Sequence, residues 1–210
     1  MRPEDAAAAS RHGADAIGVI LHPPSRRNAP IALAREIVAA VAPFVTPVGV
    51  FVNAPVQEIL DTAATLGLRM VQLNGDESPT DVAELAGLNV IKAIRVTRGG
   101  LQATLATWRA SRPSNLAGIV LEPGGTNQPG GTGVANDWDE VIGARREGAF
   151  GEMRLIAAGG LAPDTVAQVA RNLQPFAVDV SSGVEDSIGV KSQDKIQRFI
   201  EAVRDAEGAA

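Results

Sequence analysis

The sequence predicts an α/β fold, a (β/α)8 TIM barrel with eight helices but only seven of its strands. Short apolar runs alternate with amphipathic or alanine-rich segments, a pattern typical of a parallel sheet covered by its helical connections. The apolar runs are nearly continuous, as in strands buried on both faces. The glycine-rich loops come late in the chain. A doubly wound open sheet, the rival architecture, usually places its glycine fingerprint after the first strand.

The chain opens on a helix signal. In the stretch MRPEDAAAAS, Pro3 stands near the first turn, Glu4 and Asp5 follow it, and an alanine run comes next. Proline suits the first helical turn, and acidic side chains favour the positive end of the helix dipole. Because every helix of a βα barrel follows a strand, we expect the first strand to belong just before Met1.

The other elements follow in alternation. The apolar runs predict strands at residues 15–21, 47–52, 69–73, 89–96, 117–122, 154–158 and 176–180. Helical spacing of apolar residues predicts helices at residues 31–42, 54–67, 79–87, 100–111, 136–146, 162–172 and 192–206. No long linker divides the chain, so residues 1–210 are expected to form a single, incomplete βα-barrel domain.

Composition excludes several classes of function. The chain has 210 residues, is 45% hydrophobic and carries a formal net charge of −5, so neither nucleic acid nor a membrane is an expected partner. No apolar run is long enough to cross a membrane and no secretory signal is apparent, so a cytoplasmic location is expected. Cysteine is absent, which excludes disulfides, thiolate metal sites and a cysteine nucleophile or base within these residues.

Two loops stand where barrels often hold phosphate, after the last two strands. Gly159 and Gly160 directly follow one strand, and Ser181, Ser182 and Gly183 follow the next. Glycines let the backbone approach a phosphate closely, and exposed N–H groups bind the anion. Either loop alone is equally well explained as an ordinary tight turn, but both together favour phosphate binding.

A third loop, at residues 122–138, is long and rich in glycine. Long loops in compact domains are usually either functional or disordered. This loop is therefore expected either to fold over a substrate or to be a surface insertion.

Seven motifs together resemble those of phosphoribosylanthranilate isomerases of tryptophan biosynthesis. They are GADAIGVIL…PPSRR, VGVFVN, VQLNGDES, IKAIRV, GGTG…DW, AAGGLAPDTV and VDVSSGVEDSIGVKSQDKI, in that order. The resemblance runs from about Arg2 to the last helix. VDVSSGVE followed by GVK is specific, whereas GGTG alone is not.

The resemblance implies an Amadori rearrangement of an aminoaldose phosphate to an aminoketose phosphate, with no cofactor or metal. A general acid protonates the ribose ring oxygen as the ring opens to an iminium, and a general base removes the proton from C2. The enamine that results tautomerises to the ketone. The expected partner is a small phosphorylated substrate. The family is expected to be monomeric, and association is expected for a barrel that lacks a strand.

The sequence departs from the family pattern at three positions. The family's base is a cysteine in a KICG-like motif on the first strand, which would lie upstream of Met1. Glu122 stands where the family's acid is an aspartate, and its extra methylene shifts the carboxyl group. Asn74 stands where a histidine is common, and an asparagine cannot carry a proton.

Other positions match the family. Arg27 matches the family's arginine on the anthranilate side of the site, although the neighbouring Arg26 makes the register ambiguous. A guanidinium group suits a carboxylate, because the two can form a pair of parallel hydrogen bonds. Gln72 and Asp179 match inward-facing residues at strand ends, and Asp179 is expected either to contact the substrate or to anchor the last loop. His22 stands near the mouth of the predicted site, but position alone gives it no catalytic role.

Three explanations of the missing base stay open. The translated protein starts upstream, or the chain is a binding barrel without a base, or another group supplies the base. Asp179 and the α-amino group of Met1, with a reference pKa of about 8, are the candidates for the third. Unpaired sheet edges favour the first explanation.

Indoleglycerol-phosphate synthase and the tryptophan synthase α subunit share the phosphate loops after the last strands. Lys92, a strand lysine, fits the isomerase pattern better.

Overall fold

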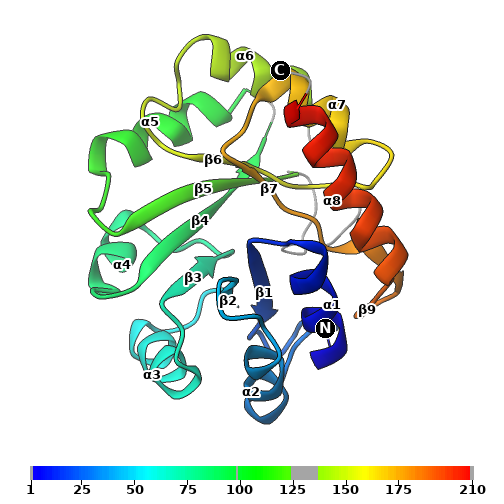
Figure 1. Ribbon diagram of the computed structural model, residues 1–210. Helices are drawn as coiled ribbons and strands as arrows, with labels where there is room; N and C mark the ends of the chain where they lie inside the picture. The colour runs from blue at the N-terminus through cyan, green and yellow to red at the C-terminus, as the bar shows by residue number, and fades with distance from the viewer. Residues whose placement is uncertain (1, 98, 124–136, 209–210) are drawn as a thin grey trace.

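Seven parallel strands form one curled sheet in a computed structural model, which describes residues 2–97, 99–123 and 137–208 (Figure 1). The strands are β1 (Ala16–Ile20), β2 (Thr46–Phe51), β3 (Met70–Leu73), β4 (Asn89–Val96), β5 (Leu116–Pro123), β6 (Leu155–Ala157) and β7 (Ala177–Val178). They pair in chain order without reversal. The barrel prediction is confirmed, because a doubly wound sheet would reverse its strand order.

Helices surround this sheet on its outer side, as Figure 1 shows. They are α1 (Pro3–His12), α2 (Ile31–Ala39), α3 (Val56–Leu66), α4 (Pro79–Glu84), α5 (Leu101–Ser111), α6 (Trp138–Arg146), α7 (Val166–Leu173) and α8 (Gln193–Gly208). The main hydrophobic core lies between these helices and the sheet. Among the described helices, none combines the length and the apolar character needed to cross a membrane.

Helix α1 forms as its sequence predicts. The Asp5 carboxylate accepts a hydrogen bond from the Arg2 backbone N–H at 3.1 Å, and this interaction caps the first turn. Gly13 ends the helix in the left-handed conformation, with φ 97°, where a side chain would be strained. The helix therefore carries its own start and stop signals.

The barrel is open between β1 and β7. Within the described residues β1 pairs only with β2, and β7 pairs only with β6. Helix α1 packs against α8, so the ring of helices closes where the sheet does not (Figure 1). A cavity of about 580 Å³ extends into this gap. Its wall there includes an apolar face of α8, formed by Ile196, Phe199, Ile200 and Val203.

A second cluster of side chains fills part of the barrel interior. Ala93, Val120 and Ala158 are buried together and form a cluster separate from the main core. Because side chains alternate along a strand, Glu122 faces the same way as Val120, into the barrel. This alternation brings Glu122 to the end of β5 that opens into the cavity.

The structure adds elements that the sequence did not predict. A 3-10 turn, η1 (Ser182–Val184), follows β7 and leads to an antiparallel hairpin of β8 (Glu185–Ser187) and β9 (Val190–Lys191). These strands are too short to show a periodic pattern. Gly189, with φ 82°, makes the hairpin turn and was the available signal.

Several helices and strands are shorter than predicted. Helix α4 ends at Glu84, three residues before the predicted end. Helix α7 starts at Val166, because the Ala162 N–H donates to the Thr165 hydroxyl and closes a turn before the helix. Strand β7 has two residues, fewer than the five predicted.

Candidate functional site

The cavity lies at the carboxyl ends of the parallel strands and collects most of the predicted site residues. Those that line it are Arg27, Gln72, Asn74, Glu122, Gly159, Gly160, Asp179, Ser181 and Ser182. They come from the ends of five strands, β1, β3, β5, β6 and β7, or from the segments that follow them. Gly183 does not line the cavity, and its role is described below.

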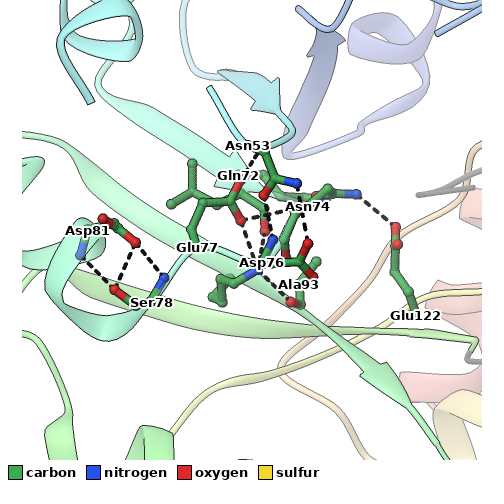
Figure 2. A network of polar contacts seen from close by, with 12 residues as sticks. Asn53, Gln72, Asn74, Asp76, Glu77, Ser78, Asp81, Ala93 and Glu122 are labelled. Atoms are coloured by element: carbon green, nitrogen blue, oxygen red, sulfur yellow. Dashed lines mark hydrogen bonds and ion pairs between the residues drawn. The ribbon is translucent and has the colours of Figure 1, made fainter. Parts of the chain in front are cut away.

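A line of three polar side chains crosses from β3 to β5 (Figure 2). Gln72 Nε2 donates to Asn74 Oδ1 at 2.8 Å, and Asn74 Nδ2 donates to Glu122 Oε1 at 2.9 Å. Asn74 and Glu122 are both buried. The asparagine that replaces the expected histidine therefore orients the carboxyl group of the candidate acid, although it carries no proton of its own.

A buried ion pair stabilises the loop that carries Asn74. Lys92 Nζ lies 3.0 Å from a Glu77 carboxylate oxygen and also donates to the carbonyls of Leu73, Gly75 and Ala93. Glu77 in turn accepts from the Asn53 N–H, at 2.7 Å, and from the Gly75 N–H. Figure 2 shows this network around the loop that follows β3. Asn74 begins that loop, so the ion pair fixes its backbone.

Lys92 is therefore a structural lysine. Burial lowers the pKa of its ammonium group, and the charge of Glu77 opposes that shift. Four acceptors surround Nζ, so the group is committed to the loop. The sequence showed that a strand lysine was present, but three of its four acceptors come from other parts of the chain.

The two predicted phosphate loops lie against each other. Gly159 and Gly160 both have positive φ, 91° and 66°, which favours glycine. A Cβ on Gly183 would collide with the Leu161 carbonyl oxygen, so this glycine allows the loops to touch. Within the described residues the N–H groups of Gly159 and Gly160 donate to no protein acceptor. These donors suit an anion.

Arg27 binds a carboxylate of the protein itself. Its Nε and Nη2 donate to the two carboxylate oxygens of Glu185, at 2.8 and 2.7 Å. Lys191 Nζ lies 3.2 Å from the same carboxylate and donates to the Ser181 carbonyl at 2.7 Å. Burial alone would raise the pKa of Glu185, but the hydrogen bonds from Arg27 and the charge of Lys191 lower it overall. Sequence reasoning missed both Glu185 and Lys191.

Asp179 follows β7 beside the open edge. Its side chain is exposed and lines the cavity. Desolvation by nearby protein atoms raises the pKa of the Asp179 carboxyl group, and the charge of Lys191 opposes this shift. The ionised carboxylate is therefore a stronger base than an aspartate of ordinary pKa.

The remaining sequence candidates have different positions. His22 lines the cavity. Met1 and residues 124–136 of the glycine-rich loop lie outside the described residues. In the part of the chain that the structure describes, no group of three histidine or acidic side chains is arranged to hold a metal ion.

Comparisons with known proteins agree on one family. The protein-family model described as N-(5'-phosphoribosyl)anthranilate (PRA) isomerase matches residues 1–202 of this chain. An N-(5'-phosphoribosyl)anthranilate isomerase of Pseudomonas fluorescens SBW25 is 42% identical over 209 residues, which are 99% of this chain and 94% of the relative. The crystal structure of the isomerase from Thermotoga maritima superposes with a TM-score of 0.85 at 34% identity, covering 98% of this chain and 95% of that one.

Two further structures bear on ligands and assembly. One isomerase was solved in complex with reduced 1-(o-carboxyphenylamino)-1-deoxyribulose 5-phosphate. It has a TM-score of 0.81 and 33% identity and covers 97% of this chain and 94% of that chain. Another structure shows monomers generated from the dimeric Thermotoga maritima enzyme, with a TM-score of 0.81 and 32% identity over 97% and 94% of the two chains. The expectation of a monomeric family therefore fails for that enzyme.

Proposed function

The chain belongs to the N-(5'-phosphoribosyl)anthranilate isomerase family, and from that premise we propose that it catalyses the Amadori rearrangement of N-(5'-phosphoribosyl)anthranilate. The product is 1-(o-carboxyphenylamino)-1-deoxyribulose 5-phosphate. One observation carries the proposal for this chain's own residues. A single cavity collects a buried carboxyl group, an arginine and two adjacent glycine-containing loops at the carboxyl ends of the strands.

Glu122 is the proposed general acid. It would give its proton to the ribose ring oxygen as the C1–O bond breaks and the anilino nitrogen forms the iminium. A general acid must be held within hydrogen-bond reach of the atom that it protonates. The hydrogen bond from Asn74 supports this role, because it restricts the glutamate, whose longer side chain has more rotamers than aspartate.

The two ends of the substrate have separate proposed sites. Gly159, Gly160, Ser181 and Ser182 would bind the phosphate through backbone and hydroxyl donors, with Gly183 holding the loops together. Arg27 would bind the anthranilate carboxylate, and Gln72 would contact the substrate between them. We propose a cytoplasmic location, and we propose that residues 1–210 form one domain.

Two groups are candidates for the base that removes the C2 proton. Asp179 is one of the carboxyl groups that line the cavity, it follows β7 at the open edge of the barrel, and its raised pKa suits proton abstraction. A cysteine-bearing strand placed between β1 and β7 would put the family's base at that same edge.

The test is turnover of N-(5'-phosphoribosyl)anthranilate by the 210-residue chain, beside a version extended at Met1 by a cysteine-bearing strand. Activity of the short chain that Asp179→Asn abolishes would assign the base to Asp179. Activity of the extended chain alone would assign it to the added cysteine. If both are inactive but bind the reduced product analogue, the protein is a binding barrel and the isomerase proposal fails.

A further inference from the structure

Arg27, which is proposed to bind the substrate carboxylate, already binds Glu185 through one edge of its guanidinium group. Their side chains are 16% and 6% exposed, and the two residues are 158 positions apart in the sequence. The contact is bidentate, through Nε and Nη2, the geometry in which an arginine–carboxylate pair is strongest. Glu185 therefore fixes the plane of the guanidinium group at the cavity wall.

A guanidinium group can bind two carboxylates at once. It has five N–H donors, and the pair with Glu185 uses one from Nε and one from Nη2. The edge formed by Nη1 and the second hydrogen of Nη2 is left for another acceptor. Within the described residues the Arg27 side chain has no further partner, and it lines the cavity.

The charge of Glu185 creates a difficulty for such a site. An arginine neutralised by a buried carboxylate attracts a second carboxylate weakly, and Glu185 would also repel that group directly. Lys191 removes this difficulty. Its ammonium group is 7% exposed and lies 3.2 Å from Glu185, so the three residues together keep a charge of +1.

We propose that Lys191, acting through Glu185, determines how strongly the site prefers ligands that carry a carboxylate at the Arg27 end. Lys191 shares the negative charge of Glu185 and so leaves Arg27 with a net positive field toward the cavity. This inference rests on the proposed function, since it takes an anthranilate-type carboxylate as the group that meets Arg27. It makes Lys191 a specificity-determining residue that acts through others.

Lys191 also holds the phosphate side of the site. Its ammonium group donates to the Ser181 carbonyl at 2.7 Å, and its backbone N–H points to the Asp5 carboxylate. A change at Lys191 therefore affects phosphate binding as well. The test must separate the two effects, and a ratio of affinities does so because the phosphate contribution cancels.

The experiment measures dissociation constants for two probes by calorimetry. One is reduced 1-(o-carboxyphenylamino)-1-deoxyribulose 5-phosphate, and the other is the same molecule without its carboxyl group. The dissociation constant of the probe without the carboxyl group, divided by that of the probe with it, measures the preference for a carboxylate. We expect Lys191→Met to reduce this ratio about tenfold, the change that follows when a charge pair loses its compensating partner.

Lys195→Met is the matched control. Lys195, on α8, contacts the same hairpin, and its replacement removes the same formal charge. It donates to the Glu185 carbonyl and to Asp186, however, and not to the Glu185 carboxylate. The ratio should stay unchanged in this variant. In a chain that carries Arg27→Met, Lys191→Met should no longer change the ratio, because effects of residues that act as a unit are not additive.

A second measurement uses the unsubstituted chain, so it does not depend on the variant folding. Burial lowers the pKa of Lys191, while Glu185 and Asp179 oppose that shift and Arg27 adds to it. The ratio should therefore fall as the pH rises toward the alkaline range and Lys191 loses its proton.

The inference would be overturned if Lys191→Met weakened the binding of both probes equally. It would also be overturned if the ratio stayed unchanged both in the variant and across the pH range. The proposed function is judged separately by turnover. A shifted ratio without turnover would leave the inference standing while the isomerase proposal fails. If the unsubstituted chain binds neither probe, both fail.

Discussion

At the scale of single residues, the carboxyl group of Glu122 is the one whose chemistry is easiest to isolate. Glu122→Gln keeps the shape and still accepts the hydrogen bond from Asn74, so the fold should hold. General acid catalysis typically contributes 10²- to 10⁴-fold. We expect kcat to fall by about that factor in whichever form of the chain turns over. A variant with unchanged kcat would mean that another group protonates the ring oxygen.

Asp179 gives a second prediction, on stability. Its raised pKa means that the folded protein binds this proton more tightly than the unfolded chain does, so folding loses stability as the pH rises through the folded-state value. Asp179→Asn removes the ionised form and should raise the melting temperature slightly at pH 7, because solvent screens the charge of this exposed side chain. The gain should vanish below pH of about 4, where the carboxyl group is protonated in both states. A gain of equal size at both pH values would contradict this assignment.

At the scale of elements, the contact between the two phosphate loops depends on Gly183. In Gly183→Ala the new methyl group would push η1 away from the Leu161 carbonyl. We expect the affinity for the reduced product analogue to fall by about tenfold or more, because the donors of the two loops no longer converge. The control is Gly143→Ala in α6, where a methyl group meets nothing within 4 Å. It should leave binding unchanged and add about 0.5–1 kcal/mol of stability.

The ion pair between Lys92 and Glu77 makes a prediction for the loop after β3. Lys92→Met leaves the Glu77 carboxylate buried without its counter-charge, which typically costs about 3–5 kcal/mol. Denaturant unfolding should show this loss, whereas Lys195→Met at the surface should change stability by less than about 0.5 kcal/mol. Equal stability of the two variants would show that the pair does not hold the loop.

At the scale of the whole molecule, the open edge of the barrel governs assembly. Strands β1 and β7 each expose one row of backbone donors and acceptors, and an apolar face of α8 lines the gap between them. Unpaired edges of this kind favour pairing with another chain. We expect the 210-residue chain to be oligomeric or poorly soluble in analytical ultracentrifugation. A monomer that melts in one sharp, cooperative transition would refute the prediction.

The sequence by itself determined the order of strands and helices and the two glycine-containing loops. Each of these follows from local signals, such as the apolar runs and the pair Gly159 and Gly160, which act over a few residues. The first helix could likewise be predicted, because Asp5 and Gly13 cap it from within. Short elements such as β8 and β9 escaped prediction, since two or three residues show no period.

Only the tertiary structure decided how the charged groups pair. Arg27 meets Glu185 across 158 positions, and Asn74 meets Glu122 across 48, so no local pattern announces either contact. Burial then sets the chemistry of these groups, because a charge removed from water must find its partner within the fold. The chain's periodicity could place Glu122 inside the barrel, but only the fold could show that an asparagine from another strand holds it there.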